Sequence, residues 1–153
     1  MIKLIAVGNR FMKDDGIAIK VTEQIKEQLT DLVLEIIIGE TDSQNCLYLL
    51  NENDFVIILD AICNGTEPGS ICVFSLKNVL SQPFGFCMQH DINIIELMKL
   101  YDKSFKGYLI GIEIADIGLG DELSPVLKEI LPQICSNIVS TIKNIITEES
   151  SHA

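Results

Sequence analysis

The chain has no long hydrophobic run: no stretch of its 153 residues approaches the roughly 18 consecutive apolar residues that span a bilayer. The N-terminus also lacks the charged start and the small-residue cleavage site of a secretory signal. We therefore expect a cytoplasmic protein that does not associate with membranes.

Paired cysteines are absent as well. The sequence has five cysteines, an odd number, and no two of them form a Cys-x-x-Cys pair, so neither a disulfide framework nor a zinc ribbon is expected. The cysteines are predicted to be reduced and mostly buried thiols; they are Cys46, Cys63, Cys72, Cys87 and Cys135.

Basic residues are scarce. There are 11 Lys and Arg against 22 Asp and Glu, which gives a formal net charge of −11. Such a charge repels phosphate backbones and argues against nucleic-acid binding. The length and the ordinary hydrophobic content predict one domain over residues 1–147, followed by a frayed tail at 148–153. We expect a monomer.

What the chain does contain is an alternation of strand-like and helix-like segments. The apolar runs that predict strands are residues 4–7, 32–38, 55–60, 71–76 and 108–114, and the predicted helices are 17–29, 45–51, 92–100 and a last one that begins at Ser124-Pro125. This order indicates an α/β fold, a three-layer α/β/α sandwich of the phosphorylase/hydrolase-like type with about five mostly parallel strands.

Two local features refine this fold. The connection between strands 55–60 and 71–76 is too short for a crossover helix, so the second of them is expected to be antiparallel. Pro132 falls inside the pattern of the last helix and is expected to kink or split it.

The first sixteen residues carry the first candidate site. Strand 4–7 ends at Gly8-Asn9, a pair suited to a sharp turn at the carboxyl edge of a sheet, where open α/β sheets bind ligands. Asp14 and Asp15 follow, directly before the helix that begins at Ile17. One reading is that these carboxylates cap the helix and lie in its dipole field. The other is that one of them binds a metal.

Two further residues converge on the same edge. Asp60 ends strand 55–60, which can neighbour the first strand in a doubly wound sheet, and His90 lies at the start of helix 92–100. Two carboxylates and an imidazole form a sensible site for nickel, zinc, iron or cobalt. For His90 alone, a capping or surface role remains the alternative.

Several motifs extend this pattern over the whole chain. The segment from Val7 to Gly16 resembles the Gly-x-Gly-Asn and Asp-Asp/Glu-Gly signature of the nickel-iron hydrogenase maturation endopeptidases. Leu59-Asp60-Ala61 and His90 match two further positions of that family, and Gly111-Ile-Glu113 and the segment from Gly118 to Pro125 resemble its late motifs. Three positions depart from the family pattern without removing a proposed ligand; they are Ala6, Ala18 and Ile114.

The resemblance implies a function. Asp15, Asp60 and His90 would bind nickel, and Asp15 and Asp60, assisted by Asp14, would be the catalytic carboxylates. The partner would be a hydrogenase large-subunit precursor that carries the nickel, and the reaction would remove its C-terminal extension after nickel insertion. The sequence does not distinguish whether the metal activates water or only docks the substrate; we favour docking.

Three alternatives remain. A metal-binding relative without proteolysis would keep the same residues. A receiver-like signalling domain would also have acids after its first and third strands, but this chain lacks the lysine expected after the fifth strand, at Ile114-Ala115. A cysteine hydrolase would use Cys87 or Cys63 with His90.

Overall fold

The structure is a computed structural model that describes residues 1–83 and 93–153. It has five strands, β1 (Ile2–Val7), β2 (Leu34–Glu40), β3 (Phe55–Ile62), β4 (Ile71–Ser75) and β5 (Lys106–Glu113). The helices are α1 (Ile17–Ile25), α2 (Ser43–Tyr48), α3 (Leu76–Leu80), α4 (Ile94–Leu100) and α5 (Pro125–His152), with the 3-10 helices η1 (Lys13–Gly16) and η2 (Lys26–Leu29). Within this part of the chain, none of the helices combines the length and the apolar character that crossing a membrane requires.

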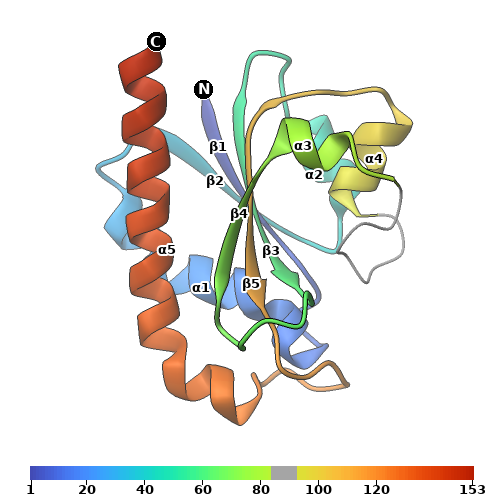
Figure 1. Ribbon diagram of the computed structural model, residues 1–153, viewed down its shortest axis with the longest axis vertical. Coiled ribbons are helices and arrows are strands. Elements are labelled where there is room, and N and C mark those ends of the chain that lie inside the picture. The colour runs from blue at the N-terminus through green and yellow to red at the C-terminus, as the bar shows by residue number, and fades with distance from the viewer. Residues whose placement is uncertain (84–92) are drawn as a thin grey trace.

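The strands form a single sheet in the order β2-β1-β3-β5-β4 (Figure 1). β1, β2, β3 and β5 are parallel, and β4 pairs antiparallel with β5. The mostly parallel sheet with one antiparallel strand, and the pairing of the first and third strands, are therefore as the sequence predicts.

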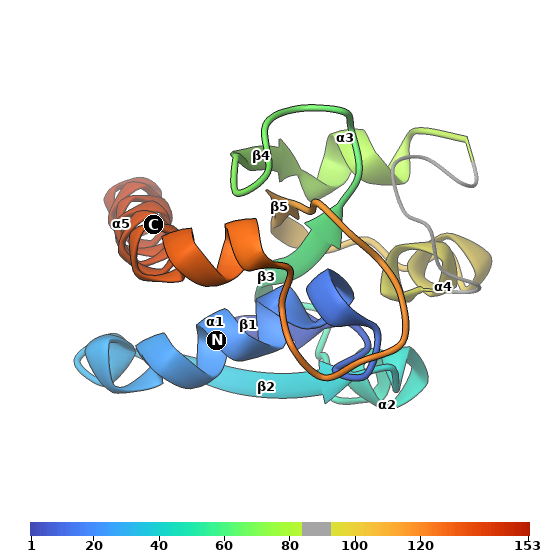
Figure 2. The ribbon, with the colours of Figure 1, turned by 90° about the horizontal axis from the view of Figure 1, so that it is seen from below.

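Helices cover both faces of this sheet (Figure 2). α1 and α5 pack on one face against a core that includes Leu4, Ile57 and Ile110. The segments α2, α3 and α4 pack on the other, against Ile5 and Ile58. Because the side chains of a strand alternate between faces, Leu59 and Ile58 belong to different cores, as the two clusters show.

Several boundaries differ from the sequence prediction, and the differences at β2 and α3 have clear local causes. β2 begins at Leu34 rather than at Leu32, because the turn after η2 extends two residues further. The short helix α3 lies where a loop was expected; Ser75 caps it by accepting a hydrogen bond from the Asn78 N–H, and Val79 packs into the core. Five residues are too few for a helical period to be visible in the sequence.

The last helix, α5, includes both Pro132 and the predicted frayed tail. Its first turns run at an angle to the remainder (Figure 1), in agreement with the kink expected from a proline in a helix. The tail is helical to His152 rather than frayed. Hydroxyl groups contribute there, since Ser150 and Ser151 donate hydrogen bonds to backbone carbonyls four residues earlier.

A buried ion pair closes the amino edge of the sheet and makes stability depend on pH. The Lys3 Nζ lies 3.0 Å from Asp54, and the Asn51 N–H donates to the same carboxylate at 2.8 Å. Burial alone would raise the pKa of Asp54, but the hydrogen bonds from Asn51 and Lys3 outweigh it and lower the pKa below its ordinary value of 3.8.

We therefore expect the free energy of unfolding to fall under acid conditions. A pKa that is lower in the folded than in the unfolded protein contributes stability above the unfolded value, and this contribution is lost as the pH falls through the folded value. Urea titrations from about pH 5 downward should show it. The Asp54→Asn variant should be less stable than the wild type at neutral pH, and its free energy of unfolding should depend less on pH below about pH 5. An unchanged pH dependence would contradict the assignment.

Candidate active site at the carboxyl edge of the sheet

Asp15 is held against the end of β1. Gly8 has a φ of 142°, and a Cβ there would lie 2.2 Å from the carbonyl oxygen of Asp15, so only glycine allows η1 to pack this closely. The Asn9 N–H donates a hydrogen bond of 2.7 Å to the Asp15 Oδ2. Asp15 is only 1% exposed. The Gly8-Asn9 turn therefore brings a carboxylate back over the strand that precedes it.

Asp60 lies on the neighbouring strand, β3. The sequence predicts that Asp60 ends this strand, but β3 continues for two more residues, to Ile62. Asp60 pairs in register with Gly111 of β5, is 1% exposed, and accepts a hydrogen bond of 2.7 Å from the Ala61 N–H. Since η1 packs against β3, Asp15 and Asp60 belong to the same edge of the sheet.

The third proposed ligand, His90, lies outside the described residues. The described part of the chain resumes at Asn93, which caps α4 by accepting a hydrogen bond of 2.9 Å from the Glu96 N–H. α4 packs on the face of the sheet to which Asp60 belongs, because Asp60 has the same parity in β3 as Ile58. Residues 1–83 and 93–153 contain no group of three or more His, Cys, Asp or Glu side chains that could hold a metal. The three-ligand hypothesis therefore depends on His90.

Asp14 has a different environment from Asp15. Its carboxylate is completely buried and accepts four hydrogen bonds from the connection between β5 and α5. The donors are the backbone N–H groups of Ala115 (3.0 Å), Asp116 (2.8 Å) and Ser124 (2.7 Å), and the Ser124 hydroxyl (2.8 Å). Both oxygens are thus engaged, and this geometry favours an anchoring role for Asp14 over the catalytic role suggested by the sequence.

Further contacts join the same two segments. The Lys13 N–H donates to the Gly120 carbonyl at 2.8 Å, and the Gly120 N–H donates to the Phe11 carbonyl at 2.9 Å. The Lys13 ammonium lies 2.8 Å from the Asp116 carboxylate, whose hydrogen bond raises the pKa of Lys13. Figure 2 shows the β5–α5 connection, in orange, beside the blue segment that follows β1. We call residues 9–16 and 115–124 the paired loops.

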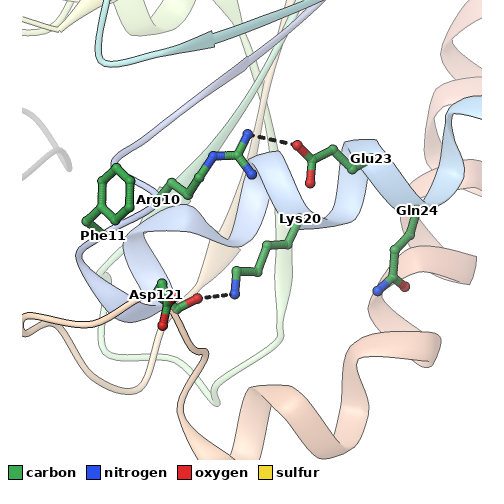
Figure 3. Close-up of a pocket in the computed structure, with 6 residues that line it drawn as sticks. All are labelled: Arg10, Phe11, Lys20, Glu23, Gln24 and Asp121. Carbon is green, nitrogen blue, oxygen red and sulfur yellow. Dashed lines mark hydrogen bonds and ion pairs between the residues drawn. The ribbon is translucent and has the colours of Figure 1, made fainter.

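A pocket of about 420 Å³ opens beside the paired loops, over the outer side of α1 (Figure 3). Its lining residues are Arg10, Phe11, Lys20, Glu23, Gln24 and Asp121. The Arg10 guanidinium donates to Glu23 at 2.7 Å and to Glu40 at 2.5 Å, and these carboxylates raise its pKa. Lys20 donates to the Asp121 carbonyl. None of the three aspartates discussed above lines this pocket, so it is separate from the candidate site.

Glu113 is a buried carboxylate for which the sequence alone predicts no role. It lies at the end of β5, paired in register with Ile62, and is 1% exposed. Its carboxylate accepts hydrogen bonds from the N–H groups of Asn64 at 3.0 Å and Gly65 at 2.9 Å. The sequence signal was the Gly111-Ile-Glu113 motif, which marks the position but not its contacts.

The described cysteines are free thiols, and two of the four, Cys46 and Cys135, are buried. Burial raises the pKa of the Cys46 thiol to about 11, and the nearby Asp42 carboxylate adds to the rise. A thiol with such a pKa is a poor nucleophile at neutral pH. Cys63 is exposed, whereas Cys87, the other candidate nucleophile, lies outside the described residues.

Several known proteins are similar to this chain in sequence or in fold. The family model described as hydrogenase maturation protease matches residues 19–141. Protein FrxA of Pyrococcus furiosus is 29% identical over 139 residues, which are 86% of this chain and 98% of that protein. Among solved structures, the [NiFe] hydrogenase maturation protease HybD from Thermococcus kodakarensis aligns with a TM-score of 0.68 and 23% identity over 95% of this chain and 98% of that one. The hydrogenase maturating endopeptidase HybD from E. coli aligns with a TM-score of 0.71 and 20% identity over 94% and 92%.

The class that these matches define is that of endopeptidases, hydrolases that act on peptide bonds. The receiver-like alternative is thereby set aside. The chain belongs to the hydrogenase maturation protease family.

Proposed function

We propose that this protein removes the C-terminal extension of a nickel-iron hydrogenase large-subunit precursor, and that it does so only after nickel has been inserted. Asp15, Asp60 and His90 are the proposed nickel ligands. The observation that carries the proposal is the pair of buried carboxylates, Asp15 on η1 and Asp60 on β3, at one edge of the sheet.

The donor chemistry supports a metal-bearing substrate. Burying a carboxylate is costly unless hydrogen bonds or a cation compensate for the lost hydration. Asp15 and Asp60 each accept a backbone hydrogen bond, through Oδ2 and Oδ1 respectively. Carboxylate oxygens together with an imidazole suit nickel, and the remaining ligands would be thiolates of the precursor.

In this scheme the nickel belongs to the substrate. Its presence completes the contact between enzyme and precursor, so that an empty precursor binds weakly and is not cleaved. We assign Asp15 and Asp60 to docking of the nickel next to the scissile bond, and Asp14 to holding the paired loops around them. Since one copy of this chain supplies all three proposed protease ligands, no second copy is needed, and we propose that the protein acts as a cytoplasmic monomer.

The test is a cleavage assay with two forms of the same precursor. Purified nickel-loaded and nickel-free precursors are incubated with the protein, and the products are identified by mass spectrometry. We expect one cut and release of the C-terminal extension from the nickel-loaded form, with at least a 100-fold slower reaction of the nickel-free form.

Two outcomes would contradict the proposal. Equal cleavage of both forms would show that the protein is a protease but does not recognise nickel. Nickel-dependent binding without any cleavage would instead support the metal-binding relative that lacks proteolysis.

A further inference from the structure

Glu113 connects both ends of the loop that follows β3. This loop, residues 63–70, begins three residues after Asp60. At its start, the Glu113 carboxylate accepts the N–H groups of Asn64 and Gly65. At its end, the Glu113 backbone donates to the Ser70 carbonyl at 2.9 Å and accepts from the Gly69 N–H at 2.8 Å. One residue of β5 therefore fixes where the loop leaves the sheet and where it returns.

The position of this loop relates it to the candidate site. Asp60 and Glu113 belong to the same face of the sheet, because Asp60 is opposite Gly111 and Glu113 is opposite Ile62, two residues further along both strands. The first five residues of the loop are exposed; they are Cys63, Asn64, Gly65, Thr66 and Glu67. An exposed loop that begins three residues after Asp60 and is held by a buried carboxylate offers a surface to a polypeptide that docks at this edge of the sheet.

The loop has a conformation that depends on this anchor. Gly65 has a φ of 80°, in the left-handed region, and a Cβ there would meet no atom within 4 Å. The space around Gly65 is thus open, and what holds its backbone is the hydrogen bond to Glu113 at 2.9 Å. No metal ligand of the proposed site belongs to the loop itself, so its shape can be changed without removing one.

We propose that Glu113 is a positioning residue for the precursor: it shapes the loop 63–70 into a surface that contacts the precursor chain next to the scissile bond. This inference rests on the proposed function and assigns to that site a determinant of substrate affinity. The loop would bind the polypeptide of the precursor, whereas Asp15, Asp60 and His90 would bind its nickel.

The experiment measures kcat and KM for cleavage of the nickel-loaded precursor by the wild type and by four variants, each corrected for its folded fraction by circular dichroism. In Glu113→Ala both loop anchors of the carboxylate are lost, and we expect KM to rise at least 10-fold while kcat changes less than 3-fold. In Glu113→Gln the amide oxygen still accepts from the loop, so the KM of this variant should lie between that of the wild type and that of Glu113→Ala. Gly65→Ala disturbs the loop without touching Glu113 and should also raise KM.

The matched control is Glu67→Gln, the same chemical change at an exposed carboxylate of the same loop. It should leave both constants within about twofold of the wild type. If the wild type cleaves and the folded Glu113 and Gly65 variants keep the wild-type KM, Glu113 is merely structural and the inference is wrong. If the wild type does not cleave the nickel-loaded precursor at all, the proposed function itself fails, and the inference fails with it.

Discussion

Asp15→Asn and Asp60→Asn should each lower the rate of cleavage of the nickel-loaded precursor more than about 100-fold. Asparagine has nearly the same shape as aspartate but no charge, so it removes the anionic ligand while its amide oxygen can still accept from Asn9 or Ala61. Both carboxylates are buried, which leaves little room for another group to replace them. Initial rates followed by mass spectrometry give the measurement, and His90→Ala should behave in the same way.

The control for this prediction is Asp42→Asn. Asp42 is an exposed carboxylate that follows β2 at the same edge of the sheet, where it caps α2 by accepting from the Asn45 N–H at 3.0 Å. This variant should keep at least half of the wild-type rate. Unimpaired cleavage by both Asp15→Asn and Asp60→Asn would show that the nickel ligands lie elsewhere.

Asp14→Ala is expected to have the largest effect on stability. Removing this buried carboxylate leaves the N–H groups of Ala115, Asp116 and Ser124 and the Ser124 hydroxyl without their acceptor. Leaving buried donors without acceptors, or breaking a buried charged network, costs about 3 kcal/mol or more. For a chain of this size, 3 kcal/mol corresponds to a decrease in Tm of roughly 6–12 °C, which calorimetry would detect.

Asp116→Ala is the matched comparison. It removes the exposed ion pair with Lys13 but leaves the Asp116 backbone N–H that Asp14 accepts. An exposed pair of this kind contributes little to stability, so the Tm should change little. A Tm of Asp14→Ala equal to that of Asp116→Ala would contradict the anchoring role of Asp14.

The architecture could be predicted because the sheet is buried on both faces. β1 and β3 are almost continuous apolar runs, interrupted by Lys3 and Asp60. The connection between β3 and β4 is too short for a crossover helix, so β4 had to run antiparallel to the other strands, although its partner in the sheet is β5 and not β3. The errors were local ones. α3 has five residues, too few for a visible period, and the helicity of the tail after Ile145 depends on hydrogen bonds within one helix and not on an apolar face.

The local geometry around the candidate carboxylates could be predicted where neighbouring residues in the sequence determine it. Gly8-Asn9 followed by Asp15 is a short-range signal, and the hydrogen bond between Asn9 and Asp15 spans only six residues. The different environments of the adjacent residues Asp14 and Asp15 could not be predicted in this way. Asp14 differs from Asp15 because its hydrogen-bond donors are more than a hundred residues away. The role of Glu113 likewise depends on a loop about fifty residues earlier in the chain. Spacing along the chain carries no information about such contacts.

The long span of the Asp14 contacts also has a consequence for folding. The Asp14 carboxylate and its donor Ser124 are 110 positions apart, so the contact closes a loop that includes most of the chain. Contacts of such high sequence separation form late, because the entropy of loop closure must be compensated before they contribute. A nascent chain that ends before Ala115 has all three aspartates but none of the four donors to the Asp14 carboxylate. We therefore expect competence to cut a partner protein to arise only when synthesis and folding of this chain are nearly complete.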